Sequence, residues 1–209
     1  MLISVEYKIT MWKDVFEMVG EKLITGQDDD AIAAYDKYNK EDLEIFRRSW
    51  YYKGKHTLLT HGDCWSNNMM FKYDTKNNVV DLKLLDWQLI KPGSPVHDLS
   101  YCLYSGASLD TYERLDDLLK LYYKHFSAIL RQCGENPEEV YHFSTLKEEW
   151  KEYCRFGMVM SLIKTTEQKD KVDLSDFGTS DNKLEIARKM IRGTPSEEYD
   201  RRIRGLFTK

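Results

Sequence analysis

The chain reads Leu59-Thr60-His61-Gly62-Asp63-Cys64-Trp65-Ser66-Asn67-Asn68-Met69-Met70, and a second stretch reads Leu84-Leu85-Asp86-Trp87-Gln88. Apolar runs of strand length flank the first stretch, and a further such run ends at Asp86. His61, Asp63 and Asn68 therefore lie in a loop between two predicted strands. We expect the oxygen-bearing side chains of Asp63, Asn68 and Asp86 to converge at the ends of these strands.

This spacing suits phosphoryl transfer to a hydroxyl group. A hydroxyl that attacks a γ-phosphate needs a carboxylate to orient it and accept its proton, and Mg²⁺ needs hard oxygen ligands beside the phosphate oxygens. Asp63 suits the first task, as catalytic base. The five-residue step from Asp63 lets a tight loop turn back, so Asn68 and Asp86 suit the metal. His61 is placed to brace the loop by hydrogen bonding.

Each of these residues also has a purely structural explanation. A single histidine such as His61 is often a structural residue, Asp63 could be a turn residue, and Asp86 could cap a helix or end a strand. A metal-dependent hydrolase with all three as ligands is a rival chemical interpretation, although it leaves Asn68 unexplained. The combination of the loop with a buried-looking strand that ends at Asp86 favours phosphoryl transfer.

Further along, the chain reads Gly93-Ser94-Pro95-Val96-His97-Asp98-Leu99. With the two stretches above, residues 57–105 resemble the ecdysteroid kinase-like family, also called CHK kinase-like. That family is related to the aminoglycoside phosphotransferases and choline kinases and has the protein-kinase-like fold. The resemblance implies ATP and Mg²⁺ as cofactors, Asp63 as catalytic base, and Asn68 and Asp86 as cofactor and metal ligands. It also implies that Asp98 is a buried brace for the catalytic loop.

The acceptor implied by the resemblance is a hydroxyl of a small molecule, with an ecdysteroid as one candidate. Protein kinases usually carry Lys two residues after the catalytic Asp; Trp65 stands there instead, which favours a small acceptor. Trp150, Tyr153 and Tyr101 could line a cage for a quaternary cation, but their helical spacing is more typical of core packing. Cys64 could be a packing thiol or a redox-sensitive one.

The remaining pattern predicts an α+β protein that is mainly α-helical. Helical periodicity covers 13–52, 97–104, 109–133, 144–166 and one or two segments after 184, whereas 57–60, 69–73 and 80–85 have strand length. We expect residues 1–55 to be helical, 56–105 to carry the catalytic and metal loops on a small β-hairpin unit, and 106–209 to be helical. Asp28-Asp29-Asp30 could bind a metal, but acidic residues also favour a helix start.

A kinase of this kind needs a nucleotide lobe with a glycine-rich loop and a strand lysine. Residues 1–60 contain no G-x-G-x-x-G pattern and no V-A-I-K-like segment. We therefore expect residues 1–209 to form a single C-terminal lobe, a truncated form with the N-terminal nucleotide lobe absent and little activity alone. A non-catalytic binding or regulatory module derived from such a kinase is the alternative function.

Charge, apolar content and cysteine spacing argue against several classes of protein. The 209 residues carry 31 Lys and Arg against 35 Asp and Glu, a formal charge of −4, which argues against a protein that binds nucleic acid phosphates. No apolar run approaches a membrane span, and the amino-terminal apolar stretch is too short for a signal peptide. Four scattered cysteines form no zinc pattern and are expected to be reduced. We expect a cytoplasmic protein with no nucleic acid partner.

Overall fold

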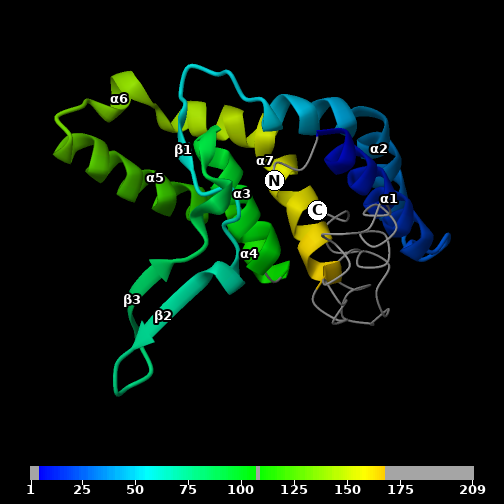
Figure 1. Ribbon diagram of the computed structural model, residues 1–209, viewed down its shortest axis with the longest axis horizontal. Helices are drawn as coiled ribbons and strands as arrows, with labels where there is room; N and C mark the ends of the chain where they lie inside the picture. Colours follow the sequence, from blue (N-terminus) through cyan, green and yellow to red (C-terminus); the bar gives the residue numbers. More distant parts are fainter. Residues whose placement is uncertain (1–4, 107–108, 168–209) are drawn as a thin grey trace, which may run out of the picture. The chain divides into compact units, whose positions relative to one another are not determined.

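A computed structural model describes residues 5–106 and 109–167, and the chain divides into two compact units. One unit contains residues up to Glu44 together with those from Val159 on, and the other runs from Ile45 to Met158. The boundaries between the units fall within helices α2 (Asp29–Trp50) and α7 (Phe143–Glu167), both of which are labelled in Figure 1. The helices expected after residue 184 lie outside the described residues.

The described residues of the first unit form helices, as predicted. Helix α1 (Val5–Lys22) packs against the start of α2, because Tyr35 stacks on Phe16 and its hydroxyl donates to the Phe16 carbonyl at 2.9 Å. Val15 and Val19 are fully buried one turn apart on α1. The predicted apolar stripe of this helix therefore faces the core of the unit.

The acidic run at the start of α2 fixes a turn. Asp28 accepts a hydrogen bond from the backbone N–H of Ile24, and Asp29 accepts one from Gly26. Asp29 and Asp30 lie in the first turn of the helix, where negative charge is favourable. This position supports the helix-start explanation. Among the described residues, no group of three or more His, Cys, Asp or Glu side chains could hold a metal.

In the described part of the second unit, two antiparallel pairs of strands form the β structure. Strand β1 (Leu58–Thr60) pairs with β4 (Lys91–Gly93), and β2 (Met69–Tyr73) pairs with β3 (Val79–Leu84). The three predicted strands are present. Strand β4 was not predicted because Pro92 argues against a strand, but a two-stranded sheet has only edge strands, where proline is tolerated.

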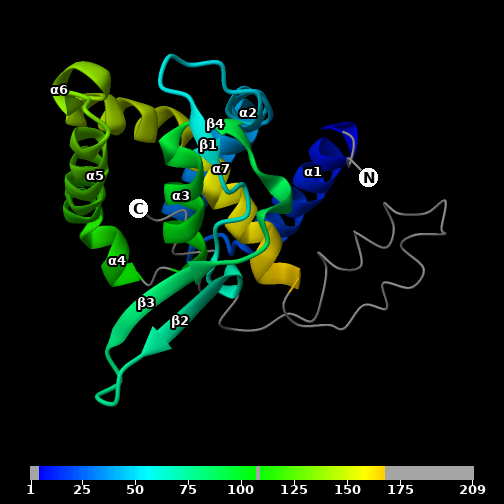
Figure 2. The same ribbon diagram turned by 60° about the vertical axis from the view of Figure 1, so that its left-hand side comes forward.

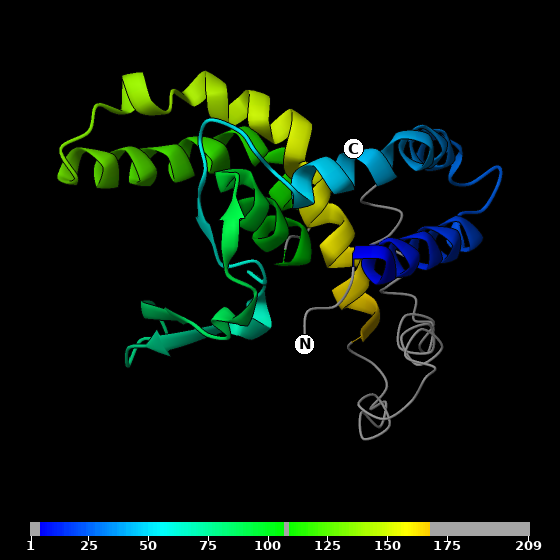
Figure 3. The same cartoon turned by 45° about the horizontal axis from the view of Figure 1, so that its top comes forward.

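The hairpin of β2 and β3 differs from the prediction in its burial. Its turn is held by Asp74, which accepts hydrogen bonds from the backbone of Lys76 and Asn78. Strand β3 was expected to be buried, and this is wrong: Val80 and Leu82 are about half exposed. The hairpin extends away from the helices of this unit in all three ribbon views (Figures 1, 2 and 3), so its apolar side chains have few neighbours.

Further helices follow the sheets in the second unit: α3 (Pro95–Gly106), α4 (Leu109–Glu113), α5 (Leu115–Gln132), α6 (Pro137–Val140) and the first part of α7. The single helix predicted over 109–133 is interrupted at Arg114, which is the N-cap residue of α5. Helix α6 begins after Asn136, whose side chain accepts a hydrogen bond from the backbone of Glu138. These elements confirm a mainly helical α+β protein.

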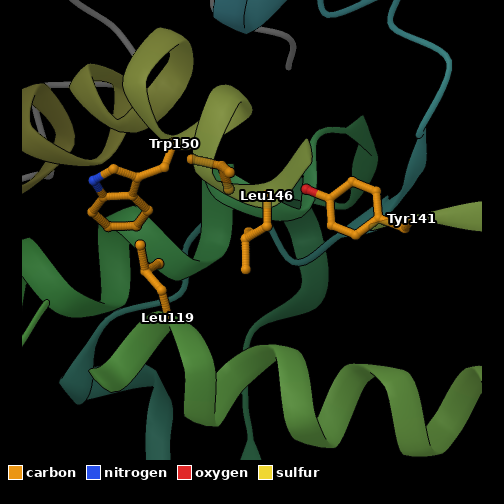
Figure 4. Packing of buried hydrophobic residues seen from close by; sticks show 5 residues of the cluster. Leu119, Tyr141, Leu146 and Trp150 are labelled. Carbon is orange, nitrogen blue, oxygen red and sulfur yellow. The ribbon is translucent and has the colours of Figure 1, made fainter. Parts of the chain in front are cut away.

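A hydrophobic cluster joins these helices. Its buried members are Val96, Leu119, Tyr141, Leu146 and Trp150. Figure 4 shows Leu119 on α5 pointing toward Trp150 on α7, with Leu146 beside them. Trp150 is 7% exposed, so the structure assigns it to the core rather than to an open cage.

Glu149 lies at the centre of a buried polar cluster. Its carboxylate accepts hydrogen bonds from the hydroxyls of Tyr52 at 2.7 Å, Ser94 at 2.6 Å and Tyr141 at 3.2 Å, and it lies 3.2 Å from Nδ1 of His56. Burial and the neighbouring carboxylate raise the pKa of Tyr52 and Tyr141, so both phenols stay protonated as donors. The cluster joins the segment after α2 to the start of α3 and to α7.

His97 is enclosed by aromatic rings. It is 0% exposed, its ring centroid lies 4.8 Å from that of Phe156, and it meets Tyr52 and Tyr153 edge-on. Neither ring nitrogen has a hydrogen-bond partner among the described residues. Burial and the charge of Lys91 lower the pKa of His97 to about 3, so the imidazole is neutral at ordinary pH.

None of the helices that the structure describes is both long enough and apolar enough to cross a bilayer.

Candidate active site

Asp63 lies on the loop that leaves β1, and only 6% of it is exposed. The preceding residue, Gly62, has φ of 82°, in the left-handed region that favours glycine. A Cβ at Gly62 would also collide with the carbonyl oxygen of Leu89. The backbone before Asp63 therefore requires glycine for two separate reasons.

The carboxylate of Asp63 is held on both oxygens. The amide nitrogen of Asn68 donates to Oδ2 at 3.0 Å and also to the Asp63 carbonyl at 3.0 Å. The hydroxyl of Tyr101 donates to Oδ1 at 3.0 Å. The structure thus brings Asp63 and Asn68 together across the tight loop and adds a third side chain.

His61 bonds within the loop through both ring nitrogens. Its Nε2 lies 2.8 Å from the carbonyl oxygen of Leu85, so this nitrogen carries the proton and donates. Its Nδ1 accepts from the backbone N–H of Asp63 at 3.3 Å. The ring also packs on Trp87, with centroids 4.6 Å apart. This arrangement suits a brace, and it leaves neither nitrogen open for a metal.

Asp98 lies on the first turn of α3 and holds the backbone of the same loop. Its Oδ2 accepts from the N–H of His61 at 2.6 Å, and its Oδ1 accepts from the N–H of Gly62 at 2.9 Å. A carboxylate that accepts two backbone N–H groups forms strong, charge-assisted hydrogen bonds. The geometry ties the loop directly to α3.

Asn68 and Asp86 lie at the same end of the β2–β3 hairpin. Met69 is paired with Leu84, and the N–H of Leu85 donates to the Asn68 carbonyl at 2.9 Å, so Asp86 follows directly. Asp86 is exposed, has φ of 62°, and accepts a hydrogen bond from Gln88 at 3.1 Å. Strand pairing brings the two residues near one another, but the side chain of Asp86 bonds to Gln88.

This donor set fits Mg²⁺. Asn68 uses its amide nitrogen to bond Asp63, which leaves its carbonyl oxygen as the atom suited to a hard cation, and Asp86 offers an exposed carboxylate. Magnesium in phosphoryl-transfer sites takes one or two carboxylates and completes its shell with phosphates and water. The hydrolase interpretation fits less well, because His61 has no nitrogen left to serve as a ligand.

Tyr101 was not predicted as a site residue. Its helical spacing suggested only a cage or core aromatic, and the structure buries it completely with its hydroxyl on Asp63. The spacing from Asp98 to Tyr101 contained a usable signal, because residues three apart on a helix share a face. Since Asp98 was expected to brace the loop, Tyr101 was also placed to reach it.

Cys64 is partly buried next to Cys102. A hydrogen bond to the Cys102 thiol, together with burial, raises the pKa of Cys64, and the same hydrogen bond lowers the pKa of Cys102. All four cysteines are free thiols, as expected. Cys64 therefore stays protonated beside Asp63.

The chain is similar in sequence to a known family of proteins. A family model described as the ecdysteroid kinase-like family matches residues 6–135, more than half of the 209 residues. The matched range includes every side chain of the candidate site. No curated protein and no solved structure matches the chain.

Proposed function

Because the chain belongs to the ecdysteroid kinase-like family, we propose that it carries the catalytic residues of an ATP-dependent phosphotransferase that acts on a hydroxyl of a small molecule. The observation that supports this proposal most directly is the state of Asp63. Its carboxylate is almost buried, bonded by Asn68 and held on a loop that Asp98 anchors. Such a carboxylate is positioned before any substrate binds.

In the proposed reaction, the Asp63 carboxylate orients the acceptor hydroxyl and takes its proton. The hydroxyl oxygen forms the new bond to the γ-phosphorus, and the bond between that phosphorus and the bridging oxygen of ADP breaks. Asn68 and Asp86 would hold Mg²⁺, which would neutralise charge on the phosphate oxygens. His61 and Asp98 hold the loop in place. Neutralisation and positioning of this kind supply most of the catalysis in phosphoryl transfer.

The test is ATP turnover with a panel of hydroxylated lipids and ecdysteroids as acceptors, run on the 209-residue chain and on a chain extended by a nucleotide-binding lobe. We expect Asp63→Asn to lower the rate by about 10²- to 10⁴-fold, as for loss of a general base. Asp81→Asn, an exposed position on β3, makes the same chemical change away from the site and should leave the rate unchanged. Equal rates for Asp63→Asn and the wild type would sink the proposal.

We further propose that these residues belong to the C-terminal lobe of a protein-kinase-like fold. The exposed apolar side chains of the β2–β3 hairpin support this assignment, because an exposed apolar patch is typical of a surface on which another domain packs. The lack of a glycine-rich pattern before His61 supports it as well. We expect the 209-residue chain alone to turn over little ATP, and a chain extended by a nucleotide-binding lobe to turn over far more.

A non-catalytic binding or regulatory module is the competing function, and the missing glycine-rich pattern is the observation in its favour. Calorimetric titration of ATP into the 209-residue chain, with and without Mg²⁺, separates the two. Affinity that depends on Mg²⁺ and falls in Asp86→Asn supports the kinase. A cytoplasmic location, where ATP and Mg²⁺ are both supplied, is part of the same proposal.

A further inference from the structure

Tyr101 contacts the proposed catalytic base through its hydroxyl, and it is one of the most deeply buried side chains of the second unit. It is 0% exposed, and its O–H donates to Oδ1 of Asp63 at 3.0 Å. A buried phenol needs a hydrogen-bond partner, and a carboxylate is the strongest acceptor that a protein offers. The contact therefore constrains Asp63 as well as Tyr101.

The two oxygens of Asp63 are bonded from two different elements. Oδ1 accepts a hydrogen bond from the hydroxyl of Tyr101 on α3, and Oδ2 accepts one from the side-chain amide of Asn68, which lies just before β2. One hydrogen bond would still let a carboxylate rotate about its Cβ–Cγ bond. Two donors on opposite oxygens fix the plane of the group, and each oxygen keeps a second lone pair for another donor.

Helix α3 also holds the backbone beside Asp63. Asp98 lies one turn before Tyr101 and accepts from the N–H groups of His61 and Gly62. One face of α3 thus binds both the main chain of the loop and the side chain at its end. The helix is itself held close to α7, because Gly157 lies directly against the backbone of Ser100 and Tyr101.

We propose that Tyr101 is a positioning residue for phosphoryl transfer, which fixes the carboxylate plane of Asp63 so that a free lone pair faces the incoming hydroxyl. This inference rests on the proposed function. The simpler explanation is that Tyr101 only fills the core, in which case its ring matters and its hydroxyl does not. The variant Tyr101→Phe separates the two explanations, since it keeps the ring and removes only the donor.

The test measures kcat and KM for ATP in the wild type, Tyr101→Phe and the control Tyr104→Phe, each as the 209-residue chain and as the chain extended by a nucleotide-binding lobe. Tyr104→Phe removes a hydroxyl from the same helix, one turn further on, where the ring stacks on Trp150. We expect Tyr101→Phe to lower kcat by about 10- to 100-fold, because small misplacements of a reacting group cost this much, with KM for ATP changed less than about twofold. Tyr104→Phe should keep the wild-type kcat.

A double-mutant cycle guards against a general folding defect. If Tyr101 acts through the Asp63 carboxylate, adding Tyr101→Phe to Asp63→Asn should lower the residual rate no further. Equal losses in both backgrounds would indicate a structural role and overturn the inference. If the wild type is active and Tyr101→Phe is equally active, the positioning role of Tyr101 is wrong and the proposed function stands. If the wild type is inactive both with and without the added nucleotide lobe, the proposed function is wrong as well.

Discussion

Gly62 is the residue whose identity the loop geometry restricts most strongly. Its positive φ alone would cost an alanine about 1–2 kcal/mol, and the collision of a new Cβ with the Leu89 carbonyl adds to this. We expect Gly62→Ala to lower the free energy of unfolding by more than about 2 kcal/mol, because both costs apply.

The matched control is Gly26→Ala. Gly26 has nearly the same φ, 83°, but apart from Gly26 and its two chain neighbours no described residue has an atom within 4 Å of the position that an alanine Cβ would take, so only the conformational cost applies. Urea unfolding followed by tryptophan fluorescence measures both variants. If the two alanines cost the same, the close approach of Leu89 to the loop is not a constraint on folding.

His97 should make stability depend on pH. Its pKa of about 3 in the folded protein lies below the usual 6.5, so between these values the unfolded chain binds a proton that the folded protein does not. Stability from this residue is complete above pH 6.5 and falls by about 1.4 kcal/mol for each pH unit below it.

Urea unfolding at pH 7.0, 6.0 and 5.0 tests this prediction. We expect His97→Phe, which keeps an aromatic ring among its aromatic neighbours, to lose about 2 kcal/mol less than the wild type in total between pH 7.0 and pH 5.0, because the full slope applies only below pH 6.5. His125→Gln, at an exposed histidine, should keep the wild-type slope. A wild-type slope in His97→Phe would mean that another group causes the pH dependence.

Sequence spacing was sufficient to predict that Asp63 and Asn68 lie close together, because a step of five residues between two strands requires a tight loop that turns back on itself. It also predicted that Asn68 lies beside Asp86. The pairing of β2 with β3 brings the two residues near one another, although the Asp86 carboxylate accepts a hydrogen bond from Gln88. The role of the Tyr101 hydroxyl depends on where α3 lies relative to the loop, and that is a property of tertiary packing. Burial of β3 was predicted wrongly, because an apolar run does not show whether anything covers it.

At the scale of whole elements, α3 and α7 approach closely at Gly157. A Cβ at this position would overlap the backbone of Ser100 and Tyr101. We expect Gly157→Ala to force the helices apart and to cost about 1–3 kcal/mol, as overpacking usually does. Because the displaced backbone carries Tyr101, the rate of ATP turnover should fall as well.

Gly106→Ala is the control for this substitution. Gly106 ends α3, and apart from its chain neighbours and the backbone of its own helix no described residue has an atom within 4 Å of the added Cβ. Thermal unfolding by circular dichroism should show a lower Tm for Gly157→Ala and little change for Gly106→Ala. Equal Tm values for Gly157→Ala and the wild type would mean that the two helices can separate without cost.

Helices and strands were predicted well where one periodic pattern dominates. They were predicted poorly where a single residue is compatible with two kinds of local structure. Pro92 is typical of a turn, yet it pairs with Leu59 in β4, because an edge strand tolerates a missing N–H. The apolar stripe through residues 109–133 is continuous, but the helix breaks at Arg114. Periodicity reports which residues share a face and is insensitive to such a break.

For the whole molecule, the β2–β3 hairpin is the feature that we expect to govern behaviour in solution. Phe71 pairs with Leu82, and both are more than 40% exposed on the apolar face of the hairpin. Exposed apolar strands promote association between chains. We expect the 209-residue chain to self-associate at high concentration, as measured by static light scattering.

Leu82→Lys should weaken this association by placing a charge on the apolar face. Asp81→Asn changes the net charge by the same amount on the opposite face of β3 and serves as the control. Equal effects of the two variants would point to net charge rather than to the apolar face as the cause.

The side chains of the candidate site all come from residues 61–101, one unbroken stretch that runs from the loop through the hairpin to α3. A site encoded in one contiguous segment can be exchanged between related genes as a unit. Recombination between related genes with crossovers outside this window would transmit the whole site as one piece. A crossover within this window would combine Asp63 from one gene with α3 from another. The loop and the helix that binds it would then come from different parents and would need compatible side chains.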